Sequence, residues 1–407
     1  CTITKSGHGL SVGDIVQLAS VTLPGGTGFS ASDFEDKNFQ VITVPTTSTF
    51  TITQSSNASA TVSTGGSLSI KPYEPVGPRA QSYGYGWGIA GWGGGNFGEA
   101  ASASDVTLEP GLWSLDNFGQ VLVATILNGK TFTWNAGAST PLETRASTTT
   151  SGFLTGSNPT ATRVSLISPT TRHLIHLGTE TTIGDTTTQD DMFIRFSDQE
   201  DINTYTPSAI NTAGTLRLQD GTKIIGALKA KEVILVWTDN ALYTMKFIGA
   251  PFTFQLEQVG TNCGLIGQNA VVEIDGAAFW LSSKGFFLYD GTVKSIPCTV
   301  EDFVYDNFDT TKGQQVAAGL NNLFTEITWY YPSSGSDYND KYVVFNYGES
   351  PGVPGGVWYT GTEARTSWID SNVYPTPFAT KYDSTTDGTF PVIVGQDDLG
   401  QTTYFEH

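Results

Sequence analysis

Cysteine, long apolar runs and basic charge are all scarce in this sequence, and each scarcity narrows what the protein can be. The three cysteines, Cys1, Cys263 and Cys298, are an odd number whose spacings match no zinc or redox motif. We expect free thiols in a reducing compartment, and a Cys263–Cys298 disulfide is the alternative. No apolar run approaches the ~18 residues of a membrane helix, and no signal peptide is visible.

Basic residues are outnumbered, with 20 Lys and Arg against 39 Asp and Glu, which gives a net charge of −19. A surface of this sign argues against binding DNA by neutralising its phosphates. It does not argue against DNA passing nearby, because a negative wall repels the polyanion and lets it slide. The chain begins at Cys1 without an initiator Met, so we expect it to be a fragment of a longer polypeptide.

Aromatic and turn-forming residues are abundant instead. Aromatics make up 12% of the chain, including nine Trp, and there are 46 Gly. Large flat side chains fill the thin layers of a β-protein, while Gly, Ser and Thr suit strands joined by tight turns. The composition therefore predicts an all-β fold.

Short hairpins recur along most of the chain. Asn128-Gly129 and Asp275-Gly276 are the strongest short-range hairpin signals. The predicted strands are 120–127, 130–134, 164–167, 173–177, 192–196, 233–238, 241–247, 271–274, 277–281, 285–289, 324–331, 342–347, 357–359, 391–395 and 402–405. They form roughly six or seven units of ~40–50 residues, the repeat of a four-stranded propeller blade. We predict a β-propeller over residues 111–407.

Two other segments precede the repeats. Residues 1–75 are predicted to form a small β-barrel or sandwich module of five or six strands, with 44–48 as one hairpin connection. Residues 76–110 are a Gly/Trp-rich linker loop, and a tract this rich in Gly holds no regular structure alone. Its Trp87 and Trp92 are expected to dock on the chain's own domain or on a neighbouring subunit.

One short helix is predicted inside the propeller. Val300, Phe303 and Val304 fall at positions i, i+3 and i+4, with Thr299 as the N-cap.

Catalytic, cofactor and metal-binding motifs are not found. The Gly-rich tract has no following Lys-Ser or Lys-Thr, so it is not a phosphate loop. His173 and His176 are three residues apart, which places them on opposite faces of a strand. They are predicted to be ordinary polar strand residues instead of a metal pair. We accordingly predict no catalytic, cofactor-binding or metal residues, and no enzyme activity.

Carboxylates crowd one stretch, at Asp190, Asp191, Asp198, Glu200 and Asp201. Such groups can bind Ca²⁺ in propeller loops, although the EF-hand spacing is absent, or hydrolyse glycosidic bonds. Solvated or inter-subunit loop charges are the favoured interpretation.

Three further carboxylates stand elsewhere. Asp397 and Asp398 are paired near the end of the chain, and Glu326 lies within an aromatic strand. We predict that Glu326 is a paired structural carboxylate, or a guard against strand addition at an edge, and not an acid catalyst.

Several consecutive stretches resemble one family. These are FIRFSDQEDINTYTPSAINTAGTLRLQDGTKIIGA from 193, VILVWTDNALYTMKFIGAPFTFQLEQVGTNCGLIG from 233, AAFWLSSKGFFLYDGTVKSIPCTVEDFVYDNFD from 277 and FTEITWYYPS from 324. They are similar to the tail nozzle and packaged-DNA stabilisation (tail hub) proteins of short-tailed bacteriophages, over roughly residues 110–380. The wording SGHGLSVGDIVQL and NFQVITVPTTSTFTI within residues 1–75 resembles a small β module inserted in many phage tail proteins.

The resemblance implies a β-propeller protomer in a homohexameric ring below the portal and adaptor complex. Such a ring retains the genome, conducts it outward during ejection and meets tail fibres or spikes. It implies location in the virion tail after assembly in the host cytoplasm, and it carries no catalytic residue or cofactor. Six chains would bring roughly −114 charges, some of which would keep passing DNA from sticking if they face the channel.

Two other functions remain open. The first is a tail-associated carbohydrate-binding or polysaccharide-degrading protein, because Trp87 and Trp92 could stack on sugar rings beside the carboxylates. The second is a propeller scaffold unrelated to viruses.

Overall fold

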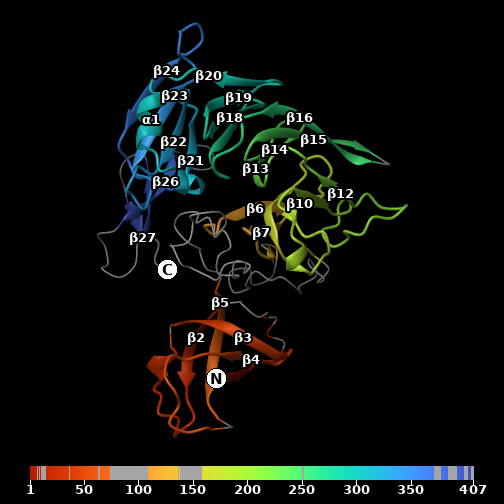
Figure 1. The fold of residues 1–407 in the computed structure, drawn as a ribbon, viewed down its shortest axis with the longest axis vertical. Coiled ribbons are helices and arrows are strands. Elements are labelled where there is room, and N and C mark those ends of the chain that lie inside the picture. Colours follow the sequence, from red (N-terminus) through yellow and green to blue (C-terminus); the bar gives the residue numbers. More distant parts are fainter. Residues whose placement is uncertain are drawn as a thin grey trace, which may run out of the picture. The chain divides into compact units, whose positions relative to one another are not determined.

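The computed structural model describes residues 1–6, 8, 10, 15–35, 37–62, 65–73, 109–135, 137, 158–249, 252–370, 377–383, 392–397 and 402–404. The chain divides into two compact units, Cys1–Gly77 and Pro78–His407 (Figure 1). The linker predicted at 76–110, with Trp87 and Trp92, lies outside the described residues except for its last two positions.

The first unit is a small β module with one five-stranded sheet in the order β1-β4-β3-β2-β5. Its strands are β1 (Thr2–Thr4), β2 (Ile15–Thr22), β3 (Asn38–Thr46), β4 (Thr49–Ile52) and β5 (Ser67–Tyr73). Side chains alternate along the strands, so Phe50 and Ile52 are buried while Thr49 and Thr51 face outward. Together with Val16, Leu18 and Val41 they form one apolar core.

The hairpin connection predicted at 44–48 is shorter in the structure. Strand β3 continues to Thr46, and only Thr47 and Ser48 join it to β4. The register shifts twice between Val41 and Thr46. Such irregular pairing lets Pro45 lie inside the strand, because a bulged position needs no N–H for the ladder.

The second unit contains six antiparallel sheets within the described residues, each built from strands consecutive in sequence. The first sheet has three strands: β6 (Trp113–Phe118), β7 (Val121–Ile126) and β8 (Thr131–Asn135). The five four-stranded sheets are β9 (Thr162–Ile167), β10 (Leu174–Thr179), β11 (Phe193–Phe196) and β12 (Gly214–Arg217); β13 (Ile224–Lys229), β14 (Ile234–Thr238), β15 (Ala241–Gly249) and β16 (Thr253–Thr261); β17 (Val271–Ile274), β18 (Ala277–Ser282), β19 (Gly285–Tyr289) and β20 (Val293–Ile296); β21 (Ala317–Asn321), β22 (Glu326–Tyr331), β23 (Lys341–Asn346) and β24 (Val357–Gly361); β25 (Ser367–Ile369), β26 (Phe378–Asp383), β27 (Val392–Asp397) and β28 (Thr402–Tyr404).

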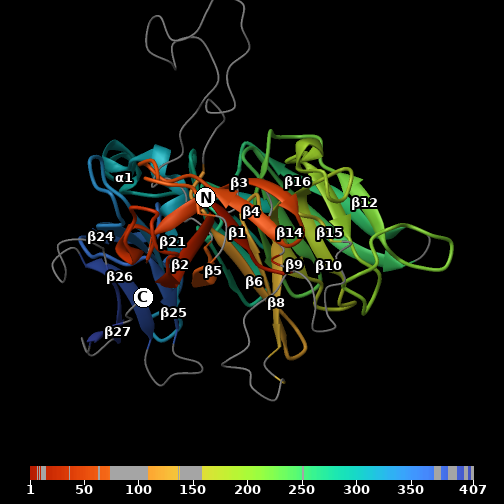
Figure 2. The same ribbon diagram turned by 90° about the horizontal axis from the view of Figure 1, so that it is seen from below.

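The sheets are arranged as the blades of a β-propeller, which confirms the predicted fold class. The first strand of one sheet contacts the first strand of another in the pairs β6 with β9, β9 with β13, β17 with β21 and β21 with β25. First strands therefore lie innermost, as propeller blades require. Figures 1 and 2 place the β9–β12 and β13–β16 sheets on one side of the unit and the β21–β24 and β25–β28 sheets on the other.

Local turn chemistry explains several of the hairpins. Asn128 has φ 57°, and Asp275 and Gly276 have φ 50° and 89°. Positive φ at the central turn positions matches the twist of the flanking strands. Both predicted hairpins are confirmed, since β7 pairs with β8 and β17 pairs with β18.

Three tryptophans repeat at the same place in successive blades. Trp237, Trp280 and Trp329 are each the fourth residue of their sheet's second strand, β14, β18 and β22. All three are fully buried, and Trp237 meets Trp280 edge to face at 5.4 Å between ring centroids. Aromatic rings therefore fill the space between blades, as the composition predicted.

The predicted helix forms one residue later than expected. Helix α1 runs over Glu301–Asn307, and its N-cap is Val300, not Thr299, with no side-chain cap. Val304 is buried against the blades, but Phe303 is 51% exposed. None of the helices in the described part of the chain has the length and apolar character needed to cross a membrane.

Candidate functional site

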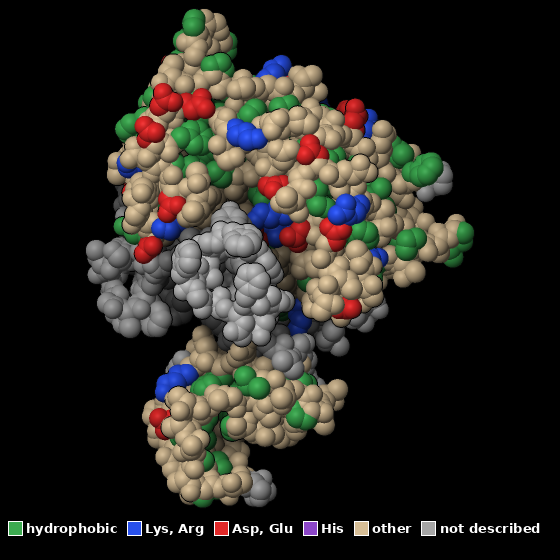
Figure 3. Space-filling view, in the orientation of Figure 1, with side chains coloured by type: hydrophobic (Ala, Val, Ile, Leu, Met, Phe, Trp, Pro, Cys, Tyr) green, Lys and Arg blue, Asp and Glu red, His purple; other side chains and the backbone are tan. Residues whose placement is uncertain are grey.

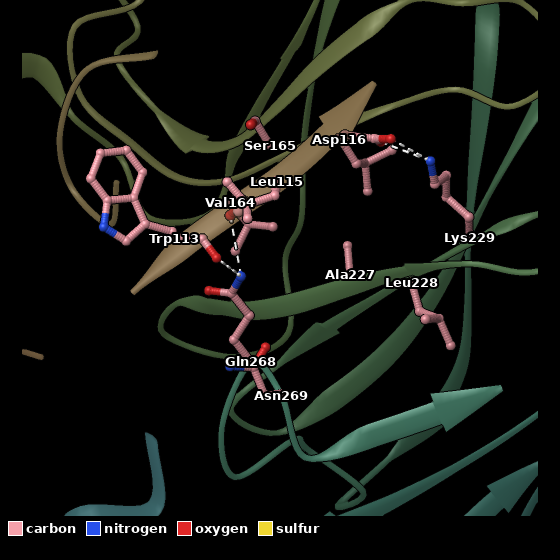
Figure 4. Close-up of a pocket in the computed structure, with 12 residues that line it drawn as sticks. Trp113, Leu115, Asp116, Val164, Ser165, Ala227, Leu228, Lys229, Gln268 and Asn269 are labelled. Atoms are coloured by element: carbon pink, nitrogen blue, oxygen red, sulfur yellow. Dashed lines mark hydrogen bonds and ion pairs between the residues drawn. The ribbon is translucent and has the colours of Figure 1, made fainter. Parts of the chain in front are cut away.

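A cavity of about 360 Å³ opens between the inner strands of the propeller (Figure 4). Its walls come from β6, β9, β13 and the segment that precedes β17. The lining residues are Trp113, Ser114, Leu115, Asp116, Val164, Ser165, Leu166, Ala227, Leu228, Lys229, Gln268 and Asn269. Four blades thus contribute to one space.

Asp116 and Lys229 form the charged pair of this cavity. Lys229 Nζ lies 2.7 Å and 2.8 Å from the two carboxylate oxygens of Asp116. The same carboxylate accepts the backbone N–H of Ile167 at 2.7 Å. Asp116 therefore joins three blades, β6, β9 and β13, and the cavity carries no net charge.

Gln268 crosses the cavity from the segment before β17. Its Nε2 donates to the Trp113 carbonyl at 3.3 Å and to Ser114 Oγ at 3.2 Å, while its buried Oε1 has no partner among the described residues. Trp113 and Leu115, on the same inner strand, are 41% and 64% exposed. The lining is thus a mixture of apolar and polar groups.

Few reactive groups are found among the described residues that line the cavity. Its hydroxyl groups are Ser114 and Ser165, and Ser165 Oγ donates to Thr125 Oγ1 at 2.7 Å. No imidazole lines it, and its one carboxylate is held by Lys229. A nucleophile needs an adjacent base to act, and this arrangement supplies none from the described residues.

A buried charge cluster lies next to the inner strands. Glu109, 3% exposed at its side chain, is 2.7 Å from Arg163 Nη2 and 2.5 Å from Lys223 Nζ. Arg163 also donates to the Ile224 carbonyl at 2.7 Å and is 3.4 Å from Asp191. Burial alone would raise the pKa of Glu109, but the Arg163 and Lys223 charges outweigh it and lower the pKa. The cluster ties β9 to β13.

The two histidines predicted as polar strand residues are fully buried, with His176 in β10 and His173 just before it. His173 packs against Phe196 and Phe254, whereas His176 bonds Thr162 Oγ1 at 3.2 Å and Tyr205 Oη at 3.0 Å. The prediction of opposite faces is confirmed by these separate surroundings. The burial comes from residues distant in sequence, such as Phe254 and Tyr205, which the sequence of one strand does not reveal.

The histidines have lowered pKa values for the same reason. Burial lowers the pKa of His173 to about 4, against a partly opposing effect of Asp198. Burial and then the charge of Arg195 lower the pKa of His176 to about 3.

The carboxylates that crowd residues 190–201 separate in space. Strand β11 places Asp190 and Asp191 at one end and Asp198, Glu200 and Asp201 at the other. Each has its own partner. The pairs are Asp190 with Arg217 at 2.6 Å, Asp191 with Arg163 at 3.4 Å, Asp198 with Thr212 at 2.6 Å, Glu200 with Arg172 at 3.5 Å and Asp201 with Thr204 at 2.7 Å. No group of His, Cys, Asp and Glu in the described residues could hold a metal ion.

Glu326, the three cysteines and the pair Asp397 and Asp398 are the other residues singled out from the sequence. Glu326 accepts a hydrogen bond from Tyr359 Oη, in agreement with its prediction as a paired carboxylate. Cys1, Cys263 and Cys298 are free, so the alternative of a Cys263–Cys298 disulfide is wrong. The side chains of Asp397 and Asp398 lie outside the described residues.

The tryptophan repeat and the cavity were both missed from the sequence. The tryptophans recur at 237, 280 and 329, a spacing of one blade that a search for aligned residues could have found. The cavity has no such signal, because its walls come from distant segments.

Comparison with known proteins gives structural neighbours only. No protein-family model and no curated protein matches the chain. Among solved structures it is similar to BamB from Moraxella catarrhalis, with 14% identity over 72% of this chain and 71% of that one at a TM-score of 0.36. A chain of the Mitotic Checkpoint Complex is 12% identical over 72% of this chain and 76% of that one, with a TM-score of 0.43. Sqt1 from Saccharomyces cerevisiae is 8% identical over 72% of this chain and 84% of that one, with a TM-score of 0.38. The propeller assignment comes from the sheet topology, and these similarities carry no argument about function.

Proposed function

We propose that the protein is a virion structural subunit, one copy of a ring in the tail nozzle or hub of a short-tailed bacteriophage. The ring retains the genome and then conducts it outward, with no sequence-specific contact to the DNA. The sequence resemblance over residues 110–380 supports this proposal, and the propeller fold agrees with what that resemblance implies. In this proposal the chain is not an enzyme and takes no cofactor, and its neighbours are copies of itself, the adaptor and portal complex and tail fibres or spikes.

Exposed apolar side chains are the observation that carries the proposal. Ile210, Leu323 and Phe252 are 97%, 79% and 73% exposed. They stand in the turns that follow β11, β21 and β15, which all lie at one end of the propeller because consecutive strands alternate in direction. Exposed side chains of this size at one end of the unit, on two of its sides, fit surfaces that contact other copies of the chain.

The experiment is the native mass of the purified chain at micromolar concentration, with negative-stain images of the same sample. The proposal predicts rings whose mass is a six-fold multiple of 43.5 kDa. A persistent monomer would refute the ring.

The second candidate is the carbohydrate-binding or polysaccharide-degrading tail protein. It depends on Trp87 and Trp92, which the structure does not describe. Release of reducing ends from a polysaccharide incubated with the chain would favour it over the structural role.

A further inference from the structure

The hairpin of β15 and β16 is longer than the others and projects from the propeller. Strands β15 and β16 have nine residues each, whereas the other strands of the unit have three to six. About three extra residues per strand extend the hairpin by roughly 10 Å. Figure 3 shows hydrophobic side chains at the tips of this hairpin and of the neighbouring loop after β11.

The tip of the hairpin is apolar: Lys246 pairs with Gln255 there, and the exposed Glu257 lies two cross-strand pairs further from the turn, opposite Thr244. Ile248 and Phe252 are 47% and 73% exposed, and the neighbouring loop is held beside them because Thr253 Oγ1 donates to the Thr212 carbonyl at 3.0 Å. Lys246 is exposed on the hairpin and is the one charged residue between 245 and 256. We call Ile210, Lys246, Ile248 and Phe252 the hairpin patch.

A second exposed patch lies on the β21–β24 sheet, on the other side of the unit in Figures 1 and 2. Leu323 and Phe324 are 79% and 56% exposed in the turn before β22. Burial raises the pKa of the Tyr359 phenol, and the nearby Glu326 and Glu349 raise it further. Neither carboxylate takes part in an ion pair within the described residues. We call Leu323, Phe324, Glu326 and Glu349 the acidic patch.

The two patches are complementary to each other and not to themselves. Each exposes large apolar side chains, but the hairpin patch carries the cation Lys246, which has no ion pair among the described residues, and the acidic patch carries two carboxylates. Two acidic patches would repel each other, and a hairpin patch on its own kind would bring two lysines together. A contact between unlike patches on two sides of one unit is heterologous, and it closes into a ring when the rotation fits.

We propose that the hairpin patch of one copy docks on the acidic patch of the next copy, with Lys246 facing Glu349. This inference rests on the proposed ring and names the surfaces that build it. The apolar side chains supply the buried area, and the charge pair fixes orientation and disfavours wrong pairings.

The test uses two blocked variants of the full chain. Ile210→Ser with Phe252→Ser blocks the hairpin patch, and Leu323→Ser with Phe324→Ser blocks the acidic patch. Each variant alone should be a monomer by native mass, and an equal mixture should give a dimer, because one intact surface of each kind remains. Phe303→Ser is the matched control, since Phe303 is 51% exposed on α1 and outside both patches, and it should still form rings.

Charge exchange tests the pair directly. Lys246→Glu should weaken assembly by on the order of tenfold, and adding Glu349→Lys to the same chain should restore it. All changes are at exposed positions, so unchanged thermal melts are expected and would show that folding is intact.

The outcomes separate this inference from the proposed function. Rings from the wild type and from both blocked variants would overturn the docking surfaces and leave the ring standing. Dimers formed by the Leu323→Ser and Phe324→Ser variant on its own would show that the hairpin patch pairs with a second hairpin patch. Such a contact is isologous, and it would also overturn the inference. A wild-type monomer that binds phospholipid vesicles through Phe252 would assign the hairpin patch to lipid and refute both.

Discussion

Trp280 Nε1 donates a hydrogen bond of 2.8 Å to the carbonyl of Cys263, in the segment that leads into the same blade. Trp329 makes the same kind of bond to Ala270, at 3.1 Å. Trp237, at the matching position of the preceding blade, has a buried Nε1 with no partner among the described residues. All three tryptophans are thus buried at the same position of their blades, but only Trp280 and Trp329 make an indole hydrogen bond within the described residues.

This difference predicts unequal effects from one substitution. Trp280→Phe removes a hydrogen bond and leaves the Cys263 carbonyl buried without its donor, whereas Trp237→Phe removes an N–H that bonds nothing. Both changes remove similar volume, so Trp280→Phe should cost about 1 kcal/mol more in unfolding free energy. Urea unfolding of the two variants measures the difference, and equal losses would show that the bond adds no net stability.

The buried charge cluster predicts a second contrast. Glu109→Gln leaves Arg163 buried without the carboxylate that lies 2.7 Å away, and breaking such a pair from one side costs about 3–5 kcal/mol. Asp191→Asn is the control, because the Asp191 side chain is 39% exposed and lies 3.4 Å from Arg163. It should cost less than about 1 kcal/mol. Thermal unfolding should rank the two variants in that order, and the reverse order would contradict the role given to Glu109.

The buried histidines predict a loss of stability in mild acid. Their folded pKa values of about 4 and about 3 lie below the ordinary 6.5, so below pH 6.5 the unfolded chain binds protons that the folded chain does not. Their contribution is complete above 6.5 and is lost as the pH falls toward those folded values, at up to about 1.4 kcal/mol per pH unit for each histidine.

The measurement is the urea midpoint between about pH 7 and pH 5. Carboxylates with lowered pKa values, such as Asp198, lose their contribution only at lower pH, so they do not add to the loss in this window. His173→Gln should flatten the dependence by about half. A midpoint that stays constant in the wild type would rule out this origin.

Local features of the sequence predicted the fold well, whereas contacts between residues far apart in the sequence could not be predicted from it. The turns at Asn128-Gly129 and Asp275-Gly276 depend on residues that adjoin each other, so they could be read directly. Asp116 and Lys229 are 113 residues apart, and no pattern along one strand announces that they meet. The burial of His176 likewise depends on Tyr205, which comes from a loop after another strand.

Crowding in sequence was misleading for a related reason. Asp190 and Asp198 are close along the chain, yet β11 carries them to opposite ends of a blade. A cluster of carboxylates therefore says little until the strand between its members is recognised.

Thiol reactivity gives the last prediction. Cys263 is buried and Cys298 is half-buried, and burial raises the pKa of each thiol from 9.0 to about 11. Because the thiolate is the reacting form, both should react slowly with a thiol reagent near pH 8, whereas the exposed Cys1 should react quickly. Labelling followed by mass spectrometry should find one modified cysteine in the folded chain and three after unfolding in urea. Rapid labelling of Cys263 in the folded chain would mean that its blade opens far more readily than its packing against Trp280 allows.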